Sequence, residues 1–199
     1  MSDLLKEEET PLSRPAATAQ SPPSAVSSSP ASDQKGAAFT AYRSRVVEYD
    51  FAGALQVVTA LKSGDPTLRK KARWLMEWKK QFIDDLRRGP LVRPIADMSG
   101  ATYQGISAAD PARVTLMLPY GVTAMSWAKL SPKSLLEAAG AFIVPGNADA
   151  ADRQWRSAVF AAETGQNDSA RILGETAAAA KPEYGQDLRL LSAAVQTPP

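Results

Sequence analysis

Hydrophobic residues recur at helical spacing from about residue 37 to residue 88. Apolar residues three or four positions apart mark one face of a helix. This spacing predicts three helices, at about residues 37–49, 51–61 and 67–88. The third helix is the longest, and its apolar face carries Leu68, Ala72, Leu75, Trp78, Phe82 and Leu86. Gly89 and Pro90 predict its end, because proline cannot continue a helix.

The pattern changes to alternation from about residue 91 to residue 127. A period of two with frequent turn residues is typical of short strands. The runs between the turns are residues 91–96, 101–107, 113–118 and 122–127. We therefore predict a four-strand antiparallel meander or small barrel within residues 90–130.

Helical spacing returns at Ser131 and Pro132, where serine is a good cap and proline suits the first turn. Further helices are expected at about residues 151–164, 167–181 and 183–195. The fold class predicted is α+β and mainly helical. Its helical regions are residues 37–89 and 131–195, the β unit at 90–130 is inserted between them, and residues 196–199 form a frayed tail.

Residues 1–36 differ from the rest because proline, serine and alanine dominate them. Such a segment buries too little apolar surface to offset its chain entropy, so we predict a disordered arm. No run approaches the roughly 20 apolar residues that a membrane helix needs. The first residues carry a glutamate run rather than a secretory signal. We expect no membrane association and a cytoplasmic location.

The chain contains no histidine and no cysteine. This excludes the histidine- and cysteine-based catalytic sites, zinc sites and disulfides. Phosphate-binding glycine loops and calcium loops are also missing from the sequence. The adjacent Asp84 and Asp85 face different directions on a helix and cannot act as a pair. We expect no enzyme, metal or cofactor, and keep an enzyme that uses only carboxylates or lysine as a remote alternative.

One face of the long helix is basic. Four cations fall within a narrow angle opposite its apolar face: Arg69, Arg73, Lys80 and Arg87. Lys70, Lys71, Lys79 and Arg88 add to its charge. Such a face is a candidate contact for nucleic acid. The alternative is a solvated face, because Glu77 and Asp84 follow Arg73 and Lys80 by four residues and can pair with them.

Aromatic residues in the predicted β unit are candidates for binding a partner. Tyr103, Tyr120 and Trp127 lie there, and exposed aromatics on a small barrel can bind peptides or stack on bases. Tyr120 lies at a turn and is the best surface candidate. Trp127 has the alternative of burial against the helix that follows.

Two segments resemble the second helix of tetratricopeptide units, in which small residues at fixed intervals let paired helices approach and a proline ends the unit. The residues at those intervals are Ala54, Val58, Leu61 and Pro66, and then Ala170, Gly174, Ala177 and Pro182. Leu61 and Gly174 depart from the family pattern in size.

The order of helices, β unit and further helices resembles accessory regions of bacterial multidomain proteins, including some serine/threonine kinase chains. In those regions a small β unit of Sm-like or Src-homology-like shape lies within tetratricopeptide-like helices. The resemblance implies a non-catalytic protein–protein interaction or scaffold module with another protein as its partner. Nucleic-acid binding is the alternative, and the sequence leaves the oligomeric state open.

Overall fold

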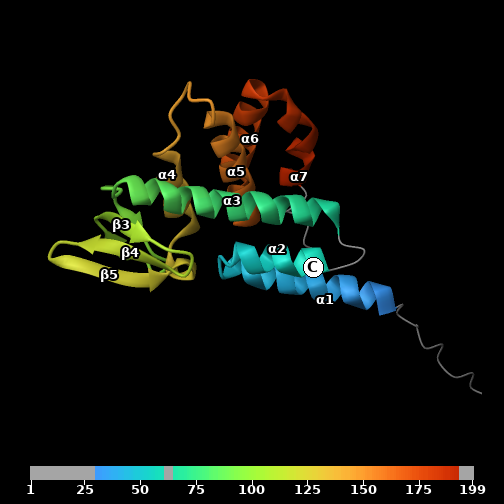
Figure 1. Ribbon diagram of the computed structural model, residues 1–199, viewed down its shortest axis with the longest axis horizontal. Helices are drawn as coiled ribbons and strands as arrows, with labels where there is room; N and C mark the ends of the chain where they lie inside the picture. The colour runs from blue at the N-terminus through green and yellow to red at the C-terminus, as the bar shows by residue number, and fades with distance from the viewer. Residues whose placement is uncertain (1–29, 61–64, 193–199) are drawn as a thin grey trace, which may run out of the picture.

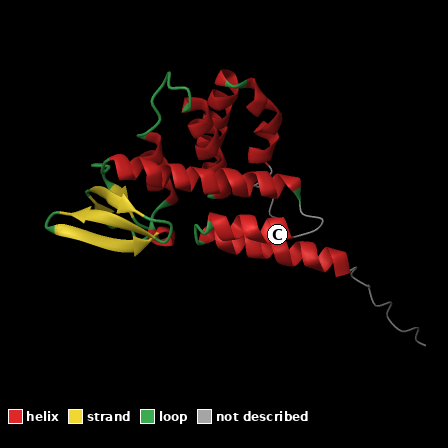
Figure 2. Ribbon diagram, in the orientation of Figure 1, coloured by secondary structure: helices red, strands yellow, loops and turns green. Residues whose placement is uncertain are grey.

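A single long helix, α3 (Pro66–Arg88), runs through the middle of the fold (Figure 1). The computed structural model describes residues 30–60 and 65–192. The helices α1 (Pro30–Val47) and α2 (Phe51–Ala60) lie along one side of α3. The other side carries α4 (Pro132–Gly140), α5 (Ala150–Glu163), α6 (Asn167–Ala180) and α7 (Leu188–Ser192). Strands gather near the carboxyl end of α3, as Figure 2 shows, so the prediction of a mainly helical α+β fold is confirmed.

The position of α3 follows from its sequence. Asp65 caps the helix by accepting a 2.7 Å hydrogen bond from the Thr67 amide, and Pro66 occupies the first turn. Its apolar face is buried, including Leu75, Trp78 and Phe82. Trp78 stacks on Phe160 of α5 with 3.9 Å between the ring centroids, which fixes α5 against α3.

The first helix begins earlier than predicted. It starts at Pro30, so residues 30–36 are helical and do not belong to a disordered arm. Residues 1–29 of the predicted arm lie outside the described residues, as do the predicted tail 196–199 and the end of the predicted last helix. That last helix is replaced, in its described part, by a 3-10 turn (Pro182–Asp187) followed by the short α7.

Just beyond the end of helix α1, one residue has an unusual backbone conformation. Tyr49 has a φ of 58°, a left-handed conformation that normally favours glycine. The Asp50 amide donates to the Arg45 carbonyl at 2.9 Å and the Tyr49 amide to the Val46 carbonyl at 3.0 Å, which is the Schellman pattern of helix ends. The buried Tyr49 ring packs near Phe51 and Phe160, so its packing offsets the backbone strain.

The strands form two small antiparallel sheets. In one, β1 (Ile95–Ala96) pairs with β2 (Thr102–Tyr103). In the other, β4 (Arg113–Leu118) lies between β3 (Gly105–Ala109) and β5 (Gly121–Ser126). The sheets do not close, so the predicted barrel is wrong, as is the single four-strand meander. Pro94 accounts for part of the difference, because it lacks an N–H and interrupts the first predicted strand just before β1.

Candidate functional site

The β4–β5 hairpin presents the most exposed aromatic side chain. Pro119 and Tyr120 form its turn, because Leu118 and Gly121 pair directly on either side. The Tyr120 side chain is fully exposed, and its apolar neighbours Leu118 and Val122 are 38% and 63% exposed. The sequence prediction that Tyr120 lies on the surface is therefore confirmed. Leu118 and Val122 lie on opposite faces of the hairpin, because side chains alternate along a strand and Leu118 pairs with Gly121, the residue before Val122. The tip therefore exposes apolar surface on both faces.

The two edges of the three-stranded sheet differ. At the β3 edge, the Leu91 amide donates to the Ile106 carbonyl at 2.9 Å, and the Ile106 amide donates back to Leu91 at 2.9 Å. The ladder between β3 and β4 also shifts register after Ile106. Both features protect an edge from pairing with other chains.

The β5 edge has no such protection. Among the described residues, β5 pairs only with β4, in an unbroken register from Leu118 opposite Gly121 to Arg113 opposite Ser126. The strand Gly121–Ser126 contains no charged residue and no proline. Natural edge strands usually carry a charge, a proline or a bulge that prevents pairing. An uncharged, regular edge is therefore open to a further strand.

The register identifies the backbone groups that face this edge. The carbonyls of Arg113 and Met117 accept hydrogen bonds from the β3 side of β4. Alternate residues of a central strand bond to opposite neighbours, so Leu116 and its partner Thr123 form a hydrogen-bonded pair. The next residues along β5, Val122 and Ala124, consequently direct their N–H and C=O groups away from β4.

The other two predicted aromatic residues are less available. Tyr103 is half-buried, and its hydroxyl donates to Asp97 Oδ2 at 3.1 Å. Trp127 is 1% exposed, and its Nε1 donates to the Asp110 carbonyl at 2.9 Å. Trp127 therefore has the buried position that was its alternative, because it packs edge-on against Phe82 and joins the β unit to α3.

Two of the four cations on the predicted basic face of α3 are paired with a carboxylate. Arg69 is half-buried, while Arg73, Lys80 and Arg87 are exposed. Asp84 accepts hydrogen bonds from both Lys80, at 2.6 Å, and Arg87, at 2.7 Å. The bond from Lys80 is the main reason that the pKa of Asp84 lies below its usual value. Glu77 binds Arg156 instead of Arg73. These contacts favour the alternative of a solvated face over a nucleic-acid contact.

Lys71 belongs to a buried network and not to the basic face. Its Nζ donates to Glu163 Oε1 at 2.9 Å, and both side chains are almost fully buried. The Tyr42 hydroxyl donates to Glu163 Oε2 at 3.2 Å, and Arg43 approaches the same oxygen at 3.4 Å. Burial raises the pKa of Tyr42 above its usual value. Glu163 thereby ties α5 to α1 and α3.

A polar cavity of about 340 Å³ brings several carboxylates near one another between α3 and α5. Arg153 occupies two of them, at 2.6 Å from Asp85 and 2.6 Å from Asp149. The hydrogen bond from Arg153 lowers the pKa of Asp149. A general acid needs a raised carboxyl pKa, so this cavity is poorly suited to acid catalysis. In residues 30–60 and 65–192 no group of acidic residues could hold a metal ion.

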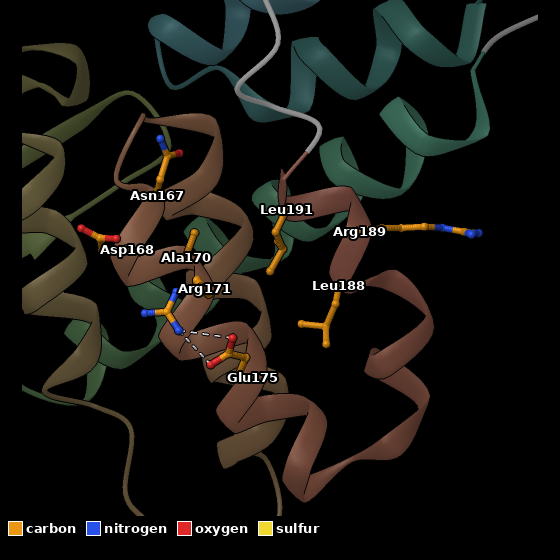
Figure 3. Close-up of a pocket in the computed structure, with 8 residues that line it drawn as sticks. All are labelled: Asn167, Asp168, Ala170, Arg171, Glu175, Leu188, Arg189 and Leu191. Carbon is orange, nitrogen blue, oxygen red and sulfur yellow. Dashed lines mark hydrogen bonds and ion pairs between the residues drawn. The ribbon is translucent and has the colours of Figure 1, made fainter.

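A cavity of about 450 Å³ lies between α6 and α7 (Figure 3). Figure 3 shows Leu188 and Leu191 turned toward α6, while Arg189 extends away. Arg171 pairs with Glu175 at 3.1 Å on its rim. On α6, a Cβ added to Gly174 would lie 2.5 Å from Leu191 Cδ1. The absence of a side chain at Gly174 therefore allows α7 to pack closely against α6. Ala170 and Ala177, two other positions of this tetratricopeptide-like segment, are buried on the same helix. In the other such segment, Leu61 lies outside the described residues.

Lys79 forms a site that the sequence did not single out. Its Nζ donates to the carbonyls of Tyr49 and Pro111, each at 2.8 Å, and lies 4.8 Å from the centroid of Trp127. The side chain is 9% exposed, and burial lowers the pKa of Lys79 to about 8. A signal was present, because Lys71 and Lys79 lie four residues before and after the buried Leu75 and so share its face.

Comparison with known proteins gives no relative: no family description, no curated protein and no solved structure matches the chain. No helix within the described ranges has both the length and the apolar character needed to cross a membrane.

Proposed function

We propose that the chain is a non-catalytic protein–protein interaction module that binds an extended, apolar segment of a partner protein along β5. The observation that carries the proposal is the uncharged, unprotected β5 edge beside the exposed Leu118, Tyr120 and Val122. Adding a strand to an open sheet edge is a common mode of peptide recognition.

The backbone supplies the affinity in this mode. Val122 and Ala124 each offer one outward N–H and one outward C=O, which allows four hydrogen bonds to a partner strand. Net contributions of about 0.5–1.5 kcal/mol for each bond give on the order of 2–6 kcal/mol in total. The apolar tip around Tyr120 adds side-chain contact and selects an apolar partner segment.

The helices serve as the scaffold in this proposal. The buried cluster is continuous from α1 through α5 to the sheet, so the hairpin projects from a rigid support. The resemblance to tetratricopeptide units with an inserted β unit, as in bacterial accessory regions, and the cytoplasmic location stay predictions.

The alternatives have weaker support. The basic face of α3 offers few unpaired cations for nucleic acid, because Asp84 engages two of its four members. An enzyme using carboxylates alone has weak support too, because arginine and lysine engage the carboxylates of the polar cavity.

A photo-crosslinking experiment in the native cell tests the proposal. A benzoylphenylalanine placed at Tyr120 should capture one partner, and the crosslink should map to an extended apolar segment. The same group at Val92, which is exposed but lies off the hairpin, is the control.

A matched variant tests the edge itself. Ala124→Pro removes an outward N–H without removing a bond to β4, so it should abolish capture while the melting temperature stays near that of the native chain. Equal capture from Tyr120 and Val92, or capture unaffected by Ala124→Pro, would contradict the proposal.

A further inference from the structure

The cavity beside Lys79 combines an apolar wall with a buried cation. It measures about 350 Å³, a size that suits a small molecule. Phe51, Met76, Ile83 and Pro111 contribute apolar lining, and Lys79 lines the cavity with its buried side chain. Such a combination matches a ligand with an apolar body and one anionic group.

The ammonium group of Lys79 has no carboxylate within 4 Å among the described residues. Its hydrogen-bond partners among the described residues are the two neutral carbonyls of Tyr49 and Pro111, which occupy two of its three N–H groups. Burial lowers the pKa of Lys79 by more than Asp50 and Asp110 raise it from a greater distance. The buried charge is therefore only partly compensated, and an anion brought into the cavity would stabilise it further.

The carboxylates that also line the cavity are already engaged. Asp84 binds Lys80 and Arg87, both of which lie at the rim. Asp50 binds Arg45 at 2.9 Å and caps α2 by accepting from the Gly53 amide at 2.9 Å. The charge left for a ligand to complement is therefore positive.

We propose that this cavity binds a small apolar monocarboxylate, with the carboxylate against Lys79 Nζ and the hydrocarbon body along Phe51, Met76 and Ile83. The site is separate from the β5 edge, because none of the residues that line it belongs to the β4–β5 hairpin. Occupation requires no catalytic step.

Calorimetry with octanoate tests this site, with octanamide as the neutral probe of the same shape. Octanoate should bind, and octanamide should bind at least tenfold more weakly because it lacks the charge that complements Lys79. Ala52→Trp places a large side chain on the exposed lining of the cavity without removing a Lys79 contact, and it should abolish octanoate binding.

Two further variants separate the ligand site from the support that Lys79 gives to the fold. Lys79→Met should abolish the preference for octanoate over octanamide. Ala179→Trp, at an exposed position on α6 outside this cavity, should leave binding unchanged. If Lys79→Met does not fold, Ala52→Trp still decides. Equal binding of both probes, no binding of octanoate, or octanoate binding that survives Ala52→Trp would overturn the proposal.

Discussion

Replacing Glu163 by methionine should strongly destabilise the fold, because it removes the charge that binds a buried lysine. The Lys71 side chain is 5% exposed and its Nζ lies 2.9 Å from Glu163, so the variant removes the carboxylate that pairs with it in the described part of the chain. The Tyr42 hydroxyl loses the same acceptor. Removing one partner of a buried ion pair costs about 3–5 kcal/mol. We expect the free energy of unfolding to fall by that amount.

The double variant Lys71→Met, Glu163→Met tests the reasoning further. Replacing both charges by apolar side chains of similar size is often nearly neutral. We therefore expect the double variant to recover most of the lost stability. It should remain less stable than the native chain by about 1–3 kcal/mol, because the Tyr42 hydroxyl has lost its acceptor.

Urea unfolding followed by tryptophan fluorescence and circular dichroism measures these changes. Asp84→Asn is the control, because it breaks contacts between exposed side chains on α3 and should cost less than about 1 kcal/mol. A loss below about 1 kcal/mol for Glu163→Met, or a double variant as unstable as the sum of the two single variants, would refute the account.

Three further predictions concern Lys79, Gly105 and the basic face of α3. Because burial lowers the pKa of Lys79 to about 8 from 10.5, the unfolded chain binds more protons between these pH values, so stability from this group rises with pH in that window. One pKa unit corresponds to about 1.4 kcal/mol. In urea titrations, the free energy of unfolding of the native chain should therefore rise by about 3 kcal/mol relative to that of Lys79→Met between pH 8 and pH 10.5. A relative stability that does not change with pH would contradict this. Gly105→Ala should lower the melting temperature by an amount equivalent to about 1–3 kcal/mol, because its Cβ would lie 2.1 Å from the Leu91 carbonyl, whereas the control Gly140→Ala meets no atom within 4 Å and should not. Replacing Arg69, Arg73, Lys80 and Arg87 by glutamine should leave the weak binding of a single-stranded oligonucleotide little changed in fluorescence anisotropy; a large loss of salt-dependent affinity would restore nucleic-acid binding as the function.

The helices could be predicted from the sequence because their signals are local. Leu75, Trp78 and Phe82 repeat at helical spacing, and Pro66 and Gly89 mark the ends of α3. The start of α1 was missed because the segment before Ala37 resembles the proline- and serine-rich arm in composition. The predicted strands at 113–118 and 122–127 match β4 and β5 to within one residue. The predicted strand at 101–107 instead divides into β2 and β3, which belong to different sheets, and only the end of the predicted strand at 91–96 forms β1, so two open sheets replace the barrel.

The candidate sites were predicted less well because they depend on distant residues. Tyr120 was found from its place in a turn, which local sequence reveals. The sequence places Lys71 and Lys79 with the basic charges of the long helix, yet both are buried. Lys71 pairs with Glu163, which is 92 positions away in sequence, and Lys79 donates to the carbonyls of Tyr49 and Pro111. Trp127 is buried for a similar reason, since its packing partner Phe82 lies on another element.

Hydrogen exchange of the β5 amides, free and bound to the captured partner, tests the central claim most directly. The account predicts that the amides of Val122 and Ala124, which face the open edge, exchange quickly in the free chain and slowly in the complex. Those of Thr123 and Met125, which bond to β4, should be protected in both states. Unchanged exchange at Val122 and Ala124 in a saturated complex would contradict docking along β5.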